Sequence, residues 1–187
     1  MKKSICSGLL ACLSLFMLPS ANAFNEACQL VAKMAGPAYV IQENRVASFT
    51  PPDKMPEEFE LTLLEQNGGW FVYQTQQAWF DKETCALLHK PSDQGRFDFA
   101  PVLLNQSTGS HAVVTSSFMI KTYRKQDIEK MAERYHFRLL TLLPSGSAAI
   151  FDVGEVASYD RMLETLDRDK DVQVAAPLLS EPRYRLR

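Results

Sequence analysis

The sequence predicts an α+β protein in two parts: a small module of one helix and an antiparallel sheet, then a unit in which strands and helices alternate. Apolar residues recur at helical spacing in three short segments. Apolar runs rich in β-branched and aromatic residues, separated by turn-forming residues, fill much of the remaining chain. A pair of cysteines placed far apart in the first part indicates a covalent tie within that module.

The composition excludes several classes of protein. Hydrophobic residues make up 46% of the 187 residues and charged residues 22%, which is the balance of a globular chain. The formal net charge is −2, so the chain has no surplus of basic side chains to neutralise phosphates. We therefore expect neither a disordered protein nor one that binds nucleic acid.

The first 23 residues have the three parts of a secretory signal peptide. Two lysines are followed by an apolar run from Ile5 to Leu18, and Ala21-Asn22-Ala23 fits the small-residue pattern of a cleavage site. We expect residues 1–23 to be removed and the mature, exported chain to begin at Phe24. No later segment reaches the ~18 apolar residues needed to span a bilayer, so no membrane association is expected after removal of the signal.

Cysteine usage fits export to an oxidising compartment. Cys6 and Cys12 leave with the signal, and Cys28 and Cys85 remain as an even pair, for which we predict a disulfide. A metal site is not expected, because the two thiols and the three histidines show no ligand spacing. The histidines are His89, His111 and His136.

The predicted N-terminal module covers residues 24–88. Residues 25–34 have one apolar face at helical spacing, and Gly36-Pro37 ends that helix. Extended segments are expected over residues 38–41, 59–64, 69–73, 77–81 and 86–88, with turns at 66–68 and 82–84. The disulfide would join the helix to the last strand. Residues 89–111 are rich in turn formers at both ends, and we interpret them as a linker between two domains.

Residues 112–187 show a sharper alternation of elements. A strand is expected over 113–123, a helix over 126–136, a hairpin over 138–143 and 148–153, a helix over 158–168 with Ser158 as its N-cap, and a strand over 172–176. The order is βαββαβ, the plan of a ferredoxin-like domain with both helices on one face of a four-stranded antiparallel sheet.

The strands of this unit are apolar at more positions than one covered face requires. In residues 139–143 and 148–151 apolar and polar side chains do not alternate regularly, which suggests that both faces of the sheet are buried. The second face would be covered either by another protein or by the N-terminal module, and the sequence leaves both alternatives open.

Three segments carry a resemblance to a known family. Phe118-Met119-Ile120-Lys121-Thr122-Tyr123 resembles its first strand, Ala148-Ala149-Ile150-Phe151-Asp152-Val153 its third strand, and residues 166–175 its closing L-x-x-D-P-x-V-x-x-V pattern. In these segments residues 113–187 resemble the propeptide of subtilisin-like proteases. The chain as a whole, with no catalytic domain behind this unit, is similar to the stand-alone external chaperones that accompany secreted kexin-like serine proteases in bacteria.

The resemblance implies a function and a partner. It implies an exported intermolecular chaperone and inhibitor, periplasmic or secreted, that assists the folding of a subtilisin/kexin-like serine protease. The sheet face without helices would dock on the protease, and the tail after the last strand would lie in the substrate cleft. The tail residues are Arg183, Tyr184, Arg185, Leu186 and Arg187.

The tail sequence suits an extended path. Pro177 and Pro182 favour extended backbone, and strands in protease clefts are held mainly by main-chain hydrogen bonds. Kexin-like proteases prefer basic residues before the cut, so Arg185 and Arg187 resemble residues that such a pocket would hold. The alternative is a solvated end without function.

Enzyme activity is not expected. The chain has no G-x-S-x-G, P-loop or H-E-x-x-H motif, and Ser145-Gly146-Ser147 is explained by a hairpin turn. We therefore expect no catalytic residues and no cofactor. The alternative to the chaperone is an exported, non-enzymatic binding or structural module with a generic ferredoxin-like domain.

Overall fold

The computed structural model describes residues 26–182. The expected signal peptide at 1–23 lies outside the described residues, as do the tail residues Arg183, Tyr184, Arg185, Leu186 and Arg187. Within the described part of the chain, no helix is long and apolar enough to cross a bilayer.

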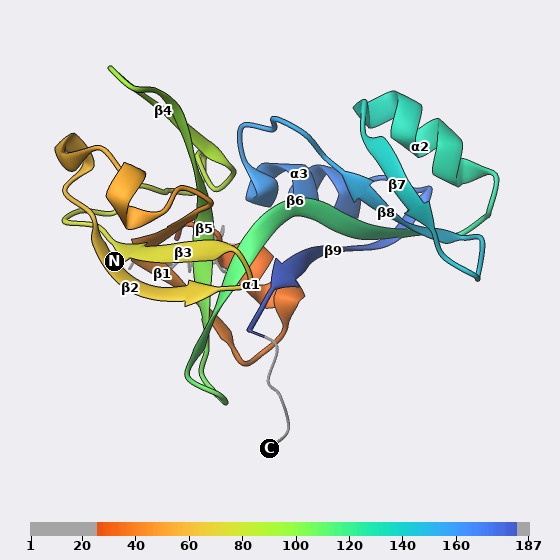
Figure 1. The fold of residues 1–187 in the computed structure, drawn as a ribbon. Coiled ribbons are helices and arrows are strands. Elements are labelled where there is room, and N and C mark those ends of the chain that lie inside the picture. Colours follow the sequence, from red (N-terminus) through yellow and green to blue (C-terminus); the bar gives the residue numbers. More distant parts are fainter. Residues whose placement is uncertain (1–25, 183–187) are drawn as a thin grey trace, which may run out of the picture.

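Three short helices and nine strands make up the regular structure of residues 26–182 (Figure 1). The helices are α1 (Gln29–Ala35), α2 (Asp127–Tyr135) and α3 (Tyr159–Asp167). The strands are β1 (Tyr39–Ser48), β2 (Thr62–Asn67), β3 (Trp70–Gln74), β4 (Leu88–Ser92), β5 (Gly95–Asn105), β6 (Ser110–Thr122), β7 (Arg138–Leu142), β8 (Ala148–Asp152) and β9 (Val172–Ser180). Two 3₁₀ turns, η1 (Pro52–Lys54) and η2 (Glu57–Phe59), lie between β1 and β2.

All nine strands belong to one antiparallel sheet. Its main path is β2-β3-β1-β5-β6-β8-β7, with β4 added to β5 and β9 added to β6. Val113 of β6 pairs with Val102 of β5 and with Ser180 of β9, so β5 and β9 lie on opposite edges of β6. Further along β6, Phe118 lies between β8 and β9 in the same way. The 13-residue strand β6 is therefore flanked on one edge by β5 and then β8, and along the other by β9.

This topology corrects the predicted fold class. The expectation of a separate helix-plus-sheet module followed by a ferredoxin-like domain was wrong, because one nine-stranded sheet with three short helices runs through both parts. The strand, helix and hairpin elements expected after residue 112 are present, but β6 and β9 also pair or pack with the first part of the chain. The physical reason is the length of β6, which is long enough to serve both regions.

The three helices share one core. Cys28 and Val31 at α1 belong to the same buried cluster as Phe118 of β6, Met131 of α2 and Tyr159 of α3. All five side chains are at most 1% exposed. The side chains of a strand alternate between its two faces. Phe118 and the residues two positions away from it on β6 therefore mark the face of the sheet that the helices cover.

The predicted Cys28–Cys85 disulfide is confirmed. The S–S distance is 2.06 Å, and both sulfur-bearing residues are fully buried. The bond joins the start of α1 to the loop before β4, and that loop also binds α3: the Tyr159 N–H donates to the Cys85 carbonyl at 2.6 Å, and the Ser158 hydroxyl donates to the Lys82 carbonyl at 2.5 Å. The disulfide therefore lies at the junction of the two parts of the chain.

Asp160 completes this junction from α3. Its buried carboxylate accepts a hydrogen bond from the Val31 N–H at 2.9 Å, in the first turn of α1. α1 has no side-chain cap of its own, so Asp160 supplies the acceptor that its free N–H groups need. Burial raises the pKa of Asp160, and the bond from Val31 opposes that rise. α3 has the predicted N-cap, with the Ser158 hydroxyl accepting from the Arg161 N–H.

Two sequence-based expectations about the middle of the chain differ from the structure. Residues 77–81 and 86–87 are not strands. The Asp81 side chain instead accepts hydrogen bonds from the N–H groups of Glu83 and Thr84, both at 2.8 Å, and such local bonds compete with strand pairing. Residues 89–111, interpreted as a linker, form most of β4, all of β5 and the first residues of β6.

The first part of the sheet curls so that β2 approaches β6. These strands are four positions apart in the sheet order, about 19 Å if the sheet were flat, because neighbouring strands lie about 4.8 Å apart. Glu65 of β2 nevertheless contacts His111 of β6, with 2.9 Å between Oε1 and Nδ1. Arg45 of β1 contacts the other ring nitrogen of His111. These three polar side chains, which we call the clasp, connect β1, β2 and β6 across the curl.

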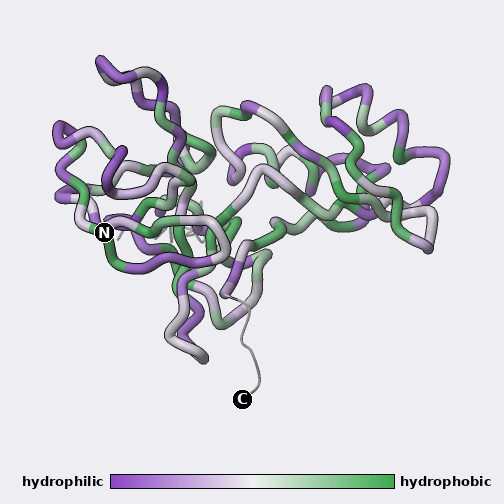
Figure 2. The backbone as a smooth tube through the Cα atoms, viewed as in Figure 1, coloured by the Kyte–Doolittle hydropathy of each residue, from purple (hydrophilic) through white to green (hydrophobic). Residues whose placement is uncertain are grey.

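The curl encloses a second core of small and medium side chains. Ala47, Val72, Ala100, Val102 and Val113 are fully buried there with Trp70. On the opposite face of the same strands, a third cluster contains Val46, Tyr73 and Phe99 under residues from the irregular segments. Figure 2 shows apolar segments gathered where β5, β6 and α1 meet, with hydrophilic stretches on α2 and at the tip of β4.

Candidate functional site

The candidate site is the face of β6, β7, β8 and β9 that lies opposite the helices. The pairing register places Thr141, Ile150, Met119 and Ala176 side by side in one row across β7, β8, β6 and β9. Met119 and Ile150 are half-buried, and neither belongs to a core cluster formed by the described residues. We call this row, together with its flanking rows, the open face.

The flanking rows of the open face carry charge. On one side Lys121 lies between Ala148 of β8 and Val174 of β9. On the other side Arg138 of β7 pairs with Asp152 of β8 at 2.5 Å. Partial burial would raise the pKa of Asp152, but the hydrogen bonds from Arg138 and from the Gly154 N–H outweigh it and hold that pKa below its ordinary value.

The edge strand β7 carries three exposed leucines, of which Leu139 and Leu142 are in register with Phe151 and Ala149 on the helix-covered side of β8. Leu139, Leu140 and Leu142 are 43%, 42% and 54% exposed. The expectation that residues 139–143 would be buried on both faces was therefore wrong for these three leucines. No other strand among the described residues pairs with the outer edge of β7, and all five residues of this strand are exposed.

The last described residues before the tail are held in place at the end of β9. β9 ends at Ser180, and the Tyr39 hydroxyl then donates a hydrogen bond to Glu181 at 2.6 Å. That hydrogen bond raises the pKa of Tyr39, because the carboxylate stabilises the protonated phenol. The Leu178 carbonyl is also held, by the Thr115 hydroxyl at 2.9 Å. The chain is thus anchored at the junction of α1, β1 and β9, from which the five tail residues continue.

The histidines act as links between strands and loops. The His89 Nδ1 lies 2.6 Å from Asp98 and its Nε2 lies 3.5 Å from Glu155, which connects the β4–β5 hairpin to the loop before α3. His111 belongs to the clasp, and His136 ends α2 in a left-handed conformation. Within residues 26–182 neither His89 nor His111 is hydrogen-bonded to a serine hydroxyl or a thiol, the arrangement of a histidine-activated serine or cysteine nucleophile. The described residues also hold no group of three or more His, Cys, Asp or Glu side chains arranged to bind a metal ion.

The open face combines a central row in which Ile150, Met119 and Ala176 are apolar with charged groups in the flanking rows, where Arg138 and Asp152 neutralise each other. Sequence reasoning expected a face without helices but did not identify its residues. The alternation of Phe118, Met119 and Ile120 is the signal that could have found them, because only the even positions point into the helix-covered core.

Comparison with known proteins gives no relative for this chain. No protein-family model, no curated protein and no solved structure matches it.

Proposed function

We propose that this protein is an exported intermolecular chaperone and inhibitor of a secreted subtilisin/kexin-like serine protease, and that it docks on the protease through the open face. The observation that carries the proposal is the row of Ile150, Met119 and Ala176, whose side chains are only half-buried and belong to no core cluster of the described residues. Apolar surface that stays uncovered in one chain is typical of a protein interface. The disulfide is compatible with an extracellular location.

The resemblance of three segments to subtilisin propeptides supports the choice of partner. Two of these segments, residues 118–123 and 148–153, form the two adjacent strands at the centre of the open face. The same strands that resemble the family therefore present Met119 and Ile150 to the partner. The resemblance to the propeptides and the open face therefore involve the same two strands, β6 and β8.

The tail is proposed to occupy the substrate cleft of the same protease. Tyr39 and Thr115 hold Glu181 and Leu178, so the segment just before the tail is fixed in place. An anchored extended segment loses less conformational freedom on binding than a free one, which favours affinity. Arg185 and Arg187 provide the basic side chains that resemble those preferred by kexin-like proteases.

A titration of a purified kexin-like protease tests both contacts. The proteins compared are residues 24–187, the same chain ending at Pro182, the Met119→Glu variant and the Arg187→Ala variant. We expect Met119→Glu to raise the inhibition constant by about tenfold or more, since a charge would be buried without a partner. We expect Arg187→Ala to cost about 2 kcal/mol or more if its contact is desolvated, and the shortened chain to lose still more.

The matched control is Met55→Glu. Met55 is also a half-buried methionine, but it packs against the third core cluster, far from the open face. It is expected to inhibit as well as the unchanged protein, with folding checked by circular dichroism. The yield of active protease after refolding with and without each protein measures the chaperone activity. Absence of inhibition and of assisted refolding by the unchanged protein would reject the proposal and favour an exported binding module with another ligand.

A further inference from the structure

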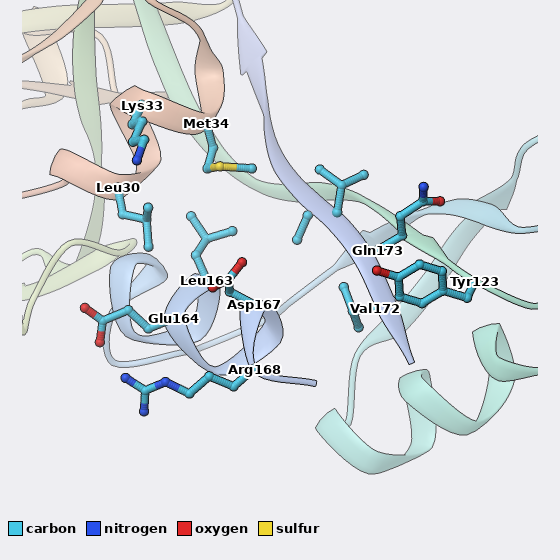
Figure 3. Close-up of a pocket in the computed structure, with 12 residues that line it drawn as sticks. Leu30, Lys33, Met34, Tyr123, Leu163, Glu164, Asp167, Arg168, Val172 and Gln173 are labelled. Carbon is cyan, nitrogen blue, oxygen red and sulfur yellow. The ribbon is translucent and has the colours of Figure 1, made fainter. Parts of the chain in front are cut away.

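A groove lies along the edge of β9 that faces away from β6 (Figure 3). Its walls are α1, which contributes Leu30 and Met34, and α3, which contributes Leu163. The cavity has a volume of about 380 Å³, within the range of peptide and small-molecule sites. In Figure 3 these three side chains point toward one another across the space between the two helices and β9.

The groove follows the edge of β9 rather than one of its faces. Four consecutive residues of this strand, Val172 to Ala175, line it. Successive side chains of a strand point to opposite faces, so a cavity over one face would meet only alternate residues. Contact with all four indicates that the main-chain edge itself borders the groove.

That edge has no strand partner among the described residues. β9 pairs with β6 along one side, from Val172 to Ser180, and with no other strand. The main-chain groups of residues 173–175 also take part in no hydrogen bond outside that ladder within residues 26–182. A free strand edge carries unpaired N–H and C=O groups and is a template for an added strand.

We propose that this groove binds an extended peptide segment of a partner protein, which adds a strand to β9 and inserts apolar side chains between α1 and α3. The segment's main chain pairs with residues 172–175. Its side chains directed to the helices pack on Leu30 and Met34, which are half-buried and pack against the main core. Tyr123, 64% exposed, lines the far end of the groove and offers an aromatic surface to the same segment.

The free main-chain edge of β9 and the apolar side chains of the helices together indicate that the ligand of the groove is an extended peptide. A small apolar molecule would use the helix side chains but leave the strand edge unpaired, whereas a peptide in extended conformation satisfies both. A folded helix would present no main-chain groups to the edge. This site goes beyond the proposed docking of a protease on the open face and does not depend on it.

The probe is a fluorescein-labelled hexapeptide of alternating serine and leucine, measured by fluorescence anisotropy with residues 24–187. A second peptide of the same sequence carries N-methyl groups on alternate amides, which removes its hydrogen bonds along one edge. We expect the first peptide to bind and the second to bind at least about tenfold more weakly. Hydrogen exchange of residues 173–175 is expected to slow when the first peptide is bound.

The matched variants are Met34→Glu in the groove and Leu142→Glu on the exposed edge of β7. Met34→Glu is expected to weaken binding about tenfold or more and Leu142→Glu to leave it unchanged, because only the first replaces an apolar side chain that lines the groove. Equal binding of both peptides by the unchanged protein would overturn strand addition. Slowed exchange at residues 138–142 in place of 173–175 would place the added strand on β7 and also overturn it.

Two further outcomes decide against the proposal. One is no binding of the peptide at millimolar concentration. The other is exchange at residues 173–175 that slows with protein concentration in the absence of peptide, which would show that a second copy of the chain occupies the edge. Neither result depends on protease inhibition, so the two proposals can fail separately.

Discussion

The two regions of the sheet bury their faces to different extents. In β1 the adjacent residues Val46 and Ala47 point to opposite faces, and both are fully buried. In β6 the adjacent residues Phe118 and Met119 also point to opposite faces, but only Phe118 is fully buried. At these positions the sheet is thus closed on both sides in β1 and on one side in β6.

The difference arises from what each region has available as cover. The first region curls, so that its own strands enclose one face, and the irregular segments around η1, η2 and residues 77–88 cover the other. The second region has three helices, and all of them pack on the same side of β6. The comparison teaches that the helices cover only one face of the second region and leave Met119 and Ile150 half-buried on the other.

The largest expected effect comes from cutting the tie between the two regions. Replacing Cys28 and Cys85 by alanine is expected to lower the free energy of unfolding by about 4 kcal/mol, since the bond closes a long loop. Urea unfolding of residues 24–187, followed by circular dichroism, measures this change. Unchanged protein is expected to show no free thiol until it is reduced, and two titratable thiols in freshly exported protein would contradict the bond.

A smaller effect separates the two faces of one strand. Phe118→Ala is expected to lower the free energy of unfolding by about 3 kcal/mol, because it leaves a cavity in the helix-covered core. Met119→Ala, one residue further on, is expected to cost less than about 1 kcal/mol, because its side chain is partly in solvent. Equal costs for both substitutions in urea unfolding would show that the open face is covered.

The smallest effect tests the curl. His111→Ala is expected to cost about 1 to 2 kcal/mol, since it removes the partner shared by Glu65 and Arg45. Opening of the curl would also expose Trp70, which is 8% exposed, and shift its fluorescence to longer wavelength. His89→Ala is the control, because His89 links surface groups whose loss is worth less than about 0.5 kcal/mol. If both variants lose the same stability, the clasp does not hold the curl.

Local sequence signals determined the individual elements of the second half. α2, α3 and the β7–β8 hairpin lie within one or two residues of the expected segments, because apolar spacing and turn residues are local properties. The Ser158 cap was predictable for the same reason, since its hydroxyl binds only three residues ahead. The disulfide was predictable from the number of cysteines left in an exported chain.

Only the tertiary structure decided how the two halves join and where the candidate sites lie. The Asp160 cap on α1 connects residues 129 positions apart, and the Glu65–His111 contact joins β2 to β6. Neither leaves a periodic pattern in the sequence. A long turn-rich segment predicts a linker when only its ends are considered, yet β5 within it pairs with both β1 and β6.

The sequence by itself determined which segments are apolar, which helices they form and which cysteines meet. It did not determine that one strand, β6, would be shared by both regions, that α1 would pack on β9 and α3, or that the open face and the groove beside β9 would stay uncovered. The physical reason is that spacing along a chain encodes local conformation, whereas strand order and the cover of each face result from competition among all buried surfaces at once.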